Sequence, residues 1–229
     1  MQLKKLLSIL LVISLSLTFL VISIERNAYN KGYYLRAFEK YNISNITGKL
    51  EIELSAITDR IIDYLKNKGG DEFLEKDFNE REILHMRDVQ DLFDMARWIK
   101  YLGLIASITI LSYFDRKKEH TLIGKTLTFG LFANYIALGI LALMVMMDFN
   151  KYFTHFHEIF FSNDLWLLDP KTDLLIQMLP EEFFIGISKN IGLSFFINLA
   201  ILQIIGLVYL RKGRMLNEKN NKDGNRRSK

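Results

Sequence analysis

The sequence of 229 residues contains no cysteine. This absence excludes a disulfide-bonded ectodomain, a thiol nucleophile and a thiolate metal site, so any extracellular part must hold together by packing alone. Two catalytic motifs are also absent: the GxSxG turn of serine hydrolases and the HExxH pair of zinc proteases. Covalent serine catalysis is therefore disfavoured, and a metal site is only a minor alternative.

Charged residues are missing from the interiors of four long apolar runs, which cover residues 6–24, 98–114, 122–147 and 191–210. A helix needs about 20 apolar residues to cross the ~30 Å hydrocarbon core of a bilayer. Lipid offers the backbone no hydrogen-bond partners, so each run is predicted to be a transmembrane helix. The interior side chains that stand out are neutral amides, whereas ion pumps and proton-coupled transporters usually keep ionisable groups there. A transporter is therefore disfavoured.

Lys and Arg are unevenly distributed between the segments that flank these runs. If the N-terminus is cytoplasmic, the inside segments carry fourteen Lys and Arg against four acids, and the outside segments carry thirteen against twenty-two acids. The positive-inside preference therefore places both termini in the cytoplasm and both large loops outside. The basic excess lies next to the membrane, where anionic headgroups are the ordinary partner, so no binding of nucleic acid is expected.

These patterns predict an all-α integral membrane protein with four transmembrane helices and a small extracellular cap. The cap is α-helical, or α+β if the segment EFLEKDF forms a short strand. The predicted parts are a cytoplasmic N-terminus with the first transmembrane helix (1–24), the extracellular cap with an interfacial helix (25–96), the second transmembrane helix (97–114), a cytoplasmic loop (115–121), the third transmembrane helix (122–147), an extracellular aromatic-rich segment (148–188), the fourth transmembrane helix (189–210) and a cytoplasmic basic tail (211–229).

The stretch FNEREILHMRDVQDLFDMARW predicts a helix that starts with a capping box, because Asn79 and Glu82 have the required spacing. His85 shares the apolar stripe of this helix with Val89, Leu92 and Ala96. Such a stripe is unfavourable in water. We therefore expect a bend near Ala96 that lays residues 80–95 along the membrane interface, with His85 facing lipid.

Three of the four histidines, His85, His155 and His157, fall in the outer segments, and His120 falls in the cytoplasmic loop. A single histidine on an apolar stripe is usually structural. Two that meet at one interface favour acid–base chemistry, because imidazole can take and return a proton near neutral pH. A metal site that also uses Glu158 is less favoured, because residues two apart share a face only on a strand.

Four stretches, NEREILHMRDV, FHEIFF, DLWLLDP and TDLLIQMLPEEFF, occur in this order between the four predicted spans. In this arrangement they resemble the lipoprotein intramolecular transacylase family of Gram-positive bacteria, most specifically in residues 79–94 and 156–184. The resemblance implies an enzyme of the cell membrane that acts on diacylglyceryl-modified lipoproteins. Such an enzyme moves the sn-2 acyl chain to the α-amino group of the N-terminal cysteine and leaves a lyso-form lipoprotein.

The same resemblance implies that His85 and His157 are the catalytic residues, at the extracellular face of the membrane. We expect His85 to act as general base and His157 as hydrogen-bond donor, although the roles can be exchanged. Glu82 and Asp88 are expected to orient the ring of His85. The expected pocket lining consists of Phe156, Phe160 and Trp166. A neutral base further predicts that activity falls below about pH 6.5.

The expected chemistry needs neither a metal nor a cofactor. The expected partners are the lipoprotein substrate and membrane lipid, and the protein is expected to be a monomer. A different class of function stays open, a non-catalytic membrane adaptor that binds a partner protein through its acidic outer face. A metal-dependent membrane hydrolase is the third hypothesis, and inhibition by a chelator would identify it.

Overall fold

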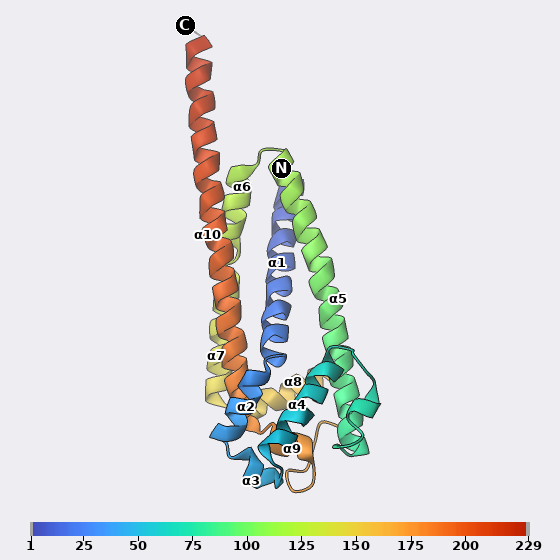
Figure 1. Cartoon of the computed structure of the whole chain (residues 1–229). Helices are drawn as coiled ribbons and strands as arrows, with labels where there is room; N and C mark the ends of the chain where they lie inside the picture. Colours follow the sequence, from blue (N-terminus) through green and yellow to red (C-terminus); the bar gives the residue numbers. More distant parts are fainter. Residues whose placement is uncertain (1, 228–229) are drawn as a thin grey trace. The chain divides into compact units, whose positions relative to one another are not determined.

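The computed structural model describes residues 2–227, with side chains described through Leu216 and at Glu218. Met1 and residues 228–229 lie outside this description, so the end of the expected basic tail falls beyond it. The described chain is helical, and residues 2–227 contain no strand (Figure 1). The elements are α1 (Gln2–Ala28), α2 (Lys31–Lys40), α3 (Ile43–Thr47), α4 (Glu51–Leu65), η1 (Asp71–Phe73), α5 (Glu80–Arg116), α6 (His120–Lys125), η2 (Thr126–Gly130), α7 (Phe132–Met147), α8 (Phe149–Phe160), α9 (Leu174–Met178) and α10 (Glu181–Arg227).

Within residues 2–227, four helical stretches are long and apolar enough to cross a membrane: Gln2–Ala28, Glu80–Arg116, His120–Met147 and Glu181–Leu216. Each contains one of the four apolar runs of the sequence. The prediction of an all-α chain with four candidate transmembrane helices is therefore confirmed.

The strand considered for the segment EFLEKDF is wrong. Residues Asp71–Phe73 form a 3-10 helix and the residues that follow are in turns. A lone strand would leave its backbone groups unpaired. The turns satisfy them locally instead, because Leu74 N donates to Asp71 O at 2.8 Å and Phe78 N donates to Leu74 O at 3.0 Å.

The chain divides into two compact units. The first unit contains the residues up to Ile22, Trp98–Ile140 and the residues from Gly192 on, and the second contains Ser23–Arg97 and Leu141–Ile191. Both unbroken helices α5 and α10 contribute residues to each unit. Each unit has its own hydrophobic core.

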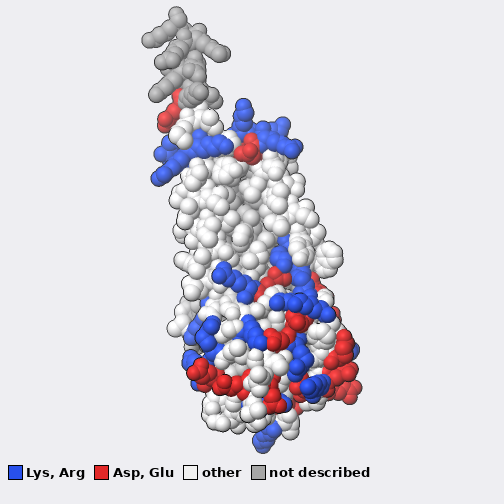
Figure 2. All heavy atoms as spheres, viewed as in Figure 1, with Lys and Arg blue, Asp and Glu red and all other residues white. Residues whose placement is uncertain are grey.

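The first unit packs its helices around a core that includes Leu11, Phe114 and Leu199. A Cβ atom at Gly206 of α10 would lie only 2.9 Å from the backbone nitrogen of Thr128, so this glycine lets α10 lie directly against η2. Many large apolar side chains of the unit remain exposed. Figure 2 shows a broad band of its visible face without charged side chains, and Lys and Arg gather at one end of that band. This surface is suited to lipid contact.

The core of the second unit is centred on α4, whose apolar side chains recur at helical spacing. Leu54, Ile57 and Ile61 of α4 are almost fully buried and pack with Leu74 and with Phe183 of α10. Helix α4 ends at Leu65, before the Gly69-Gly70 pair.

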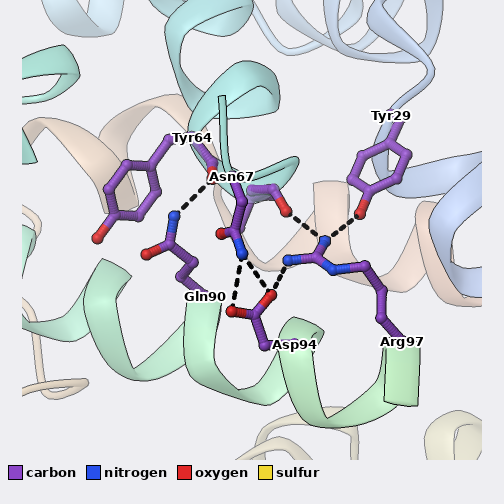
Figure 3. A network of polar contacts seen from close by, with 7 residues as sticks. Tyr29, Tyr64, Asn67, Gln90, Asp94 and Arg97 are labelled. Atoms are coloured by element: carbon purple, nitrogen blue, oxygen red, sulfur yellow. Dashed lines mark hydrogen bonds and ion pairs between the residues drawn. The ribbon is translucent and has the colours of Figure 1, made fainter. Parts of the chain in front are cut away.

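Side chains of α5 cap the carbonyl end of α4 through a polar network (Figure 3). Gln90 donates to the Tyr64 carbonyl at 2.7 Å, and Arg97 donates to the Leu65 carbonyl at 2.7 Å. Arg97 also contacts Tyr29 and forms an ion pair with Asp94. Since the last carbonyls of a helix have no partner within the helix, these bonds fix α4 against α5.

Helix α5 is unbroken from Glu80 to Arg116, and helical hydrogen bonding continues through Ala96. We expected a bend near Ala96, and the structure has no interruption of the helix at that residue. Sharp kinks usually need proline, a π-bulge or an inserted side chain or water, and the sequence places no proline in α5.

Candidate active site

The start of α5 sets the position of His85. Asn79 Oδ1 accepts from the Glu82 backbone N–H at 3.0 Å, and Glu82 Oε2 accepts from the Asn79 backbone N–H at 2.8 Å. This is the predicted capping box, and it begins the helix at Glu80. The second oxygen of the same carboxylate accepts from Leu175 N at 2.6 Å, at the start of α9. Glu82 is 1% exposed, and burial raises the pKa of its carboxyl group, while bonds from backbone N–H groups oppose the rise.

Helix α8 brings His157 to the same place. Asp148 caps its N-terminus by accepting from Lys151 N at 3.0 Å. His157 is buried on one face of α8, whereas His155 is exposed and its Nδ1 lies 2.9 Å from Glu158. Residues two apart on a helix face different ways, so the structure separates His155 from His157.

The rings of His85 and His157 lie close together. Their centroids are 6.0 Å apart and their planes are inclined by 37°. His85 is 8% exposed and His157 is 6% exposed. The expectation that His85 faces lipid is therefore wrong, because protein atoms cover it. The apolar stripe of α5 packs against other elements of the second unit at this point.

Aromatic rings enclose His157. Trp166 stacks on the imidazole with centroids 4.8 Å apart, and Phe153 meets it edge-on at 4.3 Å. Phe156 contacts it at 5.4 Å. Two of the three predicted lining residues, Trp166 and Phe156, thus contact this histidine. Phe160 is half exposed and lines an open cleft nearby.

The hydrogen bonds of the two imidazoles differ. The Nδ1 atom of His157 lies 2.7 Å from the Phe153 carbonyl oxygen. A carbonyl can only accept, so Nδ1 carries the proton and the neutral ring keeps its lone pair on Nε2. The Nδ1 atom of His85, by contrast, is buried and has no hydrogen-bond partner among the described residues.

Burial shifts the proton affinity of both rings. It lowers the pKa of His85 to about 4, aided by the neighbouring His157 and opposed by the carboxylate of Asp88. Burial also lowers the pKa of His157, and the bond to the Phe153 carbonyl opposes this shift. Both imidazoles are therefore neutral at neutral pH.

The two acids expected to orient His85 have other partners. Glu82 caps α5 and bonds to Leu175 N, as described above. Asp88 accepts a hydrogen bond from Asn163 Nδ2 at 2.9 Å. Neither carboxylate bonds to Nδ1 of His85, since that atom has no partner within residues 2–227. The effect of Asp88 on His85 is electrostatic.

Two open clefts lie beside the histidine pair. One, of about 280 Å³, has two acids, Asp88 and Asp91, beside apolar walls that include Leu92 and Phe160. The other, of about 450 Å³, is lined by residues that include Trp166 and Leu167. Phe161, Ser162 and Asn163 belong to the walls of both.

The arrangement offers groups for acid–base chemistry. Among the described residues, no three His, Asp or Glu side chains are grouped so that they could hold a metal ion. The pair of imidazoles can accept a proton at one atom and donate a hydrogen bond from another, beside an apolar wall.

A family model described as lipoprotein intramolecular transacylase Lit matches residues 9–184, a range that includes both histidines and more than half of the chain. The chain belongs to the Lit family. It is therefore a transacylase, as the sequence resemblance predicted.

The fold is also similar to solved structures of Lit. The membrane integral lipoprotein intramolecular transacylase Lit from Bacillus cereus superposes with a TM-score of 0.79 and 22% sequence identity, over 93% of this chain and 99% of that chain. A structure of the Bacillus cereus protein with an H85R mutation, in its own numbering, gives the same score and identity over 93% of this chain and 95% of that chain. A search of curated proteins found no match. At this level of identity, the solved structures show a shared fold.

Sequence reasoning missed several residues of the candidate site, chiefly Phe153, Phe161 and Asn163. Phe153 and Phe161 lie four residues before and after His157, and residues at this spacing share a helix face. This four-residue spacing could have been used if residues 149–160 had been predicted as a helix. Asn163 has no such signal, because its partner Asp88 is 75 residues away.

Proposed function

We propose that this Lit family member transfers the sn-2 acyl chain of a diacylglyceryl-modified lipoprotein to the α-amino group of its own N-terminal cysteine. The amine nitrogen attacks the ester carbonyl carbon, so a C–N bond forms and the ester C–O bond breaks. The proton lost by the amine ends on the released glyceryl oxygen. The product is an N-acylated lyso-form lipoprotein, and no other reactant is needed.

The observation that carries this proposal is the pair of buried, neutral imidazoles with ring centroids 6.0 Å apart. The reaction needs one group that removes a proton and one that stabilises the developing oxyanion. Both groups must act within one small site, since the ester that gives up the acyl chain and the amine that receives it belong to the same molecule. His85 and His157 meet this requirement.

The hydrogen bonds favour His157 as the base and His85 as the oxyanion donor, which exchanges the roles we first expected. The Phe153 carbonyl fixes the proton of His157 on Nδ1, so Nε2 is free to accept a proton from the amine. A ring whose pKa is about 4 is a weak base at neutral pH. Such a ring stays neutral, however, and a neutral imidazole N–H can donate to an oxyanion.

Positioning is the larger part of the proposed catalysis. The atoms from the amine nitrogen through Cα, Cβ, sulfur and the glyceryl carbons to the acyl carbon close an eight-membered ring in the transition state. A flexible chain seldom adopts this ring. Holding the substrate in the folded shape can contribute several kcal/mol, on the order of the effects measured for intramolecular reactions. The aromatic wall of Phe156, Phe160 and Trp166 is suited to this task.

We expect the reaction to occur at the outer face of the cell membrane, with both termini in the cytoplasm. The charge distribution of the sequence supports this orientation. Membrane lipid and the lipoprotein substrate are the expected partners of a monomeric enzyme.

The test is to incubate the purified protein with a synthetic diacylglyceryl lipopeptide. Acyl transfer leaves the mass of the peptide unchanged but removes its free amine, which an amine-labelling reagent detects. We expect His85→Asn and His157→Asn to lower the rate by a factor of about 10² or more. The matched control is His155→Asn, which changes an exposed histidine of α8. Full activity of a folded His157→Asn variant would overturn the mechanism.

A further inference from the structure

The two histidines are not in contact with the open clefts beside them. Each ring is more than nine-tenths buried. The walls of the two clefts described above include neither His85 nor His157. A diacylglyceryl substrate in either cleft could not touch the imidazoles unless a part of the wall moved.

Phe161 is a residue that contacts both histidines and also lines both clefts. Its ring meets His85 edge-on with centroids 5.4 Å apart, and it lies 5.5 Å from the ring of His157. It lines both clefts and is itself 8% exposed. Phe161 therefore joins both imidazoles to the walls of both clefts, whereas Trp166, which stacks on His157, lines only the second cleft.

The position of Phe161 depends on few bonds. It is the first residue after α8, with an extended backbone, and its N–H donates to the His157 carbonyl at 2.8 Å. Two further bonds hold the following residues to α5: Asn163 Nδ2 donates to Asp88, and Arg81 donates to the Asp164 carbonyl. The first of these bonds is partly buried and the second is exposed.

We propose that Phe161 is the gate of the active site and that the bond between Asn163 and Asp88 holds it closed. The proposal rests on the proposed function only in taking His85 and His157 as the reacting pair. In the closed state the gate keeps water from the imidazoles. When substrate binds, the ring of Phe161 moves aside and becomes part of the wall that contacts the substrate.

Chemical modification of the histidines tests the gate without any need for acyl transfer. Diethyl pyrocarbonate acylates neutral imidazole, and peptide mass spectrometry reads each histidine separately. In the chain without substitutions, at pH 7, we expect His85 to react about tenfold or more slowly than the exposed His155. His85 reacts only when the structure around it opens locally. Phe161→Ala should raise the rate at His85 about tenfold and leave His155 unchanged.

The matched control is Phe160→Ala, which removes a half-exposed ring next to the gate. It should leave the rate at His85 unchanged. Asn163→Ala keeps the ring of Phe161 but removes the hydrogen bond to Asp88. It should raise the modification rate at His85 about threefold or more. Phe161→Leu serves if the alanine variant does not fold, which thermal unfolding shows.

Equal modification rates at His85 and His155 in the chain without substitutions would overturn the proposal. So would equal effects of Phe160→Ala and Phe161→Ala, or no effect of Asn163→Ala. These outcomes leave the proposed function untouched, because that is tested by loss of the free amine in the lipopeptide.

Discussion

His85 and His157 are kept neutral by burial, and this has a cost at low pH. An unfolded chain binds protons on its histidines near pH 6.5, whereas folded His85 has a pKa of about 4. Between these values the unfolded chain binds more protons than the folded chain. The free energy of unfolding therefore falls as the pH drops from about 6.5 toward 4, and the pair has no such effect above this range.

We predict that this pH dependence is weaker in the double variant His85→Asn, His157→Asn. Thermal unfolding in detergent at pH 7.5 and at pH 5 measures it. Carboxyl groups also contribute to the slope, so the quantity to compare is the difference between the two proteins. An identical fall in unfolding temperature for both proteins would contradict the neutral state of the pair.

The tautomer of His157 is a second prediction at this scale. The bond to the Phe153 carbonyl requires the proton on Nδ1. We expect ¹⁵N NMR of imidazole-labelled protein at neutral pH to show His157 with an unprotonated Nε2. The His157→Asn variant identifies the signal. An Nε2–H tautomer would contradict the assignment of His157 as the base.

The residues of the site were only partly predictable from the sequence. His85 and His157 followed from their place in motifs that resemble a family. The bond from Leu175 N to Glu82 could not be predicted, because the two residues are 93 positions apart and no sequence pattern indicates it. Burial lowers the pKa values of both imidazoles from the reference value we used, so we now expect activity to fall at a lower pH than first predicted.

At the scale of elements, one carboxylate joins the starts of two helices. Glu82 accepts from Asn79 N at the start of α5 and from Leu175 N at the start of α9. The first N–H groups of a helix have no partner within the helix. Glu82 thus satisfies one such group at Leu175 while it completes the capping box of the helix that carries His85.

Replacing this carboxylate should destabilise the second unit. We predict that Glu82→Ala lowers the free energy of unfolding by about 1–3 kcal/mol, the usual cost of a buried backbone group left unpaired. Glu80→Ala, in the same turn but exposed, should change it by less than about 0.5 kcal/mol. Denaturant unfolding followed by circular dichroism measures both. Equal effects would show that the link between α5 and α9 contributes nothing.

Capping and apolar spacing predicted the start of α5, because both are local properties of the sequence. They could not tell what covers the apolar stripe of α5. We assumed lipid, and the structure covers His85 with Phe161 and His157. Lipid and protein are equally apolar, so the stripe alone does not distinguish them. The short strand considered for residues 72–78 does not form, because residues 2–227 contain no partner strand.

At the scale of the whole molecule, the four long apolar helices were the most predictable feature. A bilayer allows very few structures, and a helix of sufficient apolar length is one of them. The fold is shared with a Bacillus cereus protein at only 22% identity. The fold therefore tolerates different residues at most positions of the sequence.

The direction in which the chain crosses the membrane is a prediction that the absence of native cysteine makes simple to test. We expect Lys76→Cys to react with a membrane-impermeant maleimide on intact cells. Lys117→Cys should react only after the membrane is permeabilised. Both positions are exposed lysines. The reverse pattern would place the histidines on the cytoplasmic side and contradict the proposed site of action.

The stack of Trp166 on His157 gives this protein an intrinsic optical signal. The chain has only two tryptophans, and the other, Trp98, is largely exposed. Protonated imidazole quenches indole fluorescence, so emission from Trp166 depends on the charge of the ring 4.8 Å away. With Trp98 replaced by phenylalanine, the remaining emission would follow proton arrival at the reaction centre, without any attached dye.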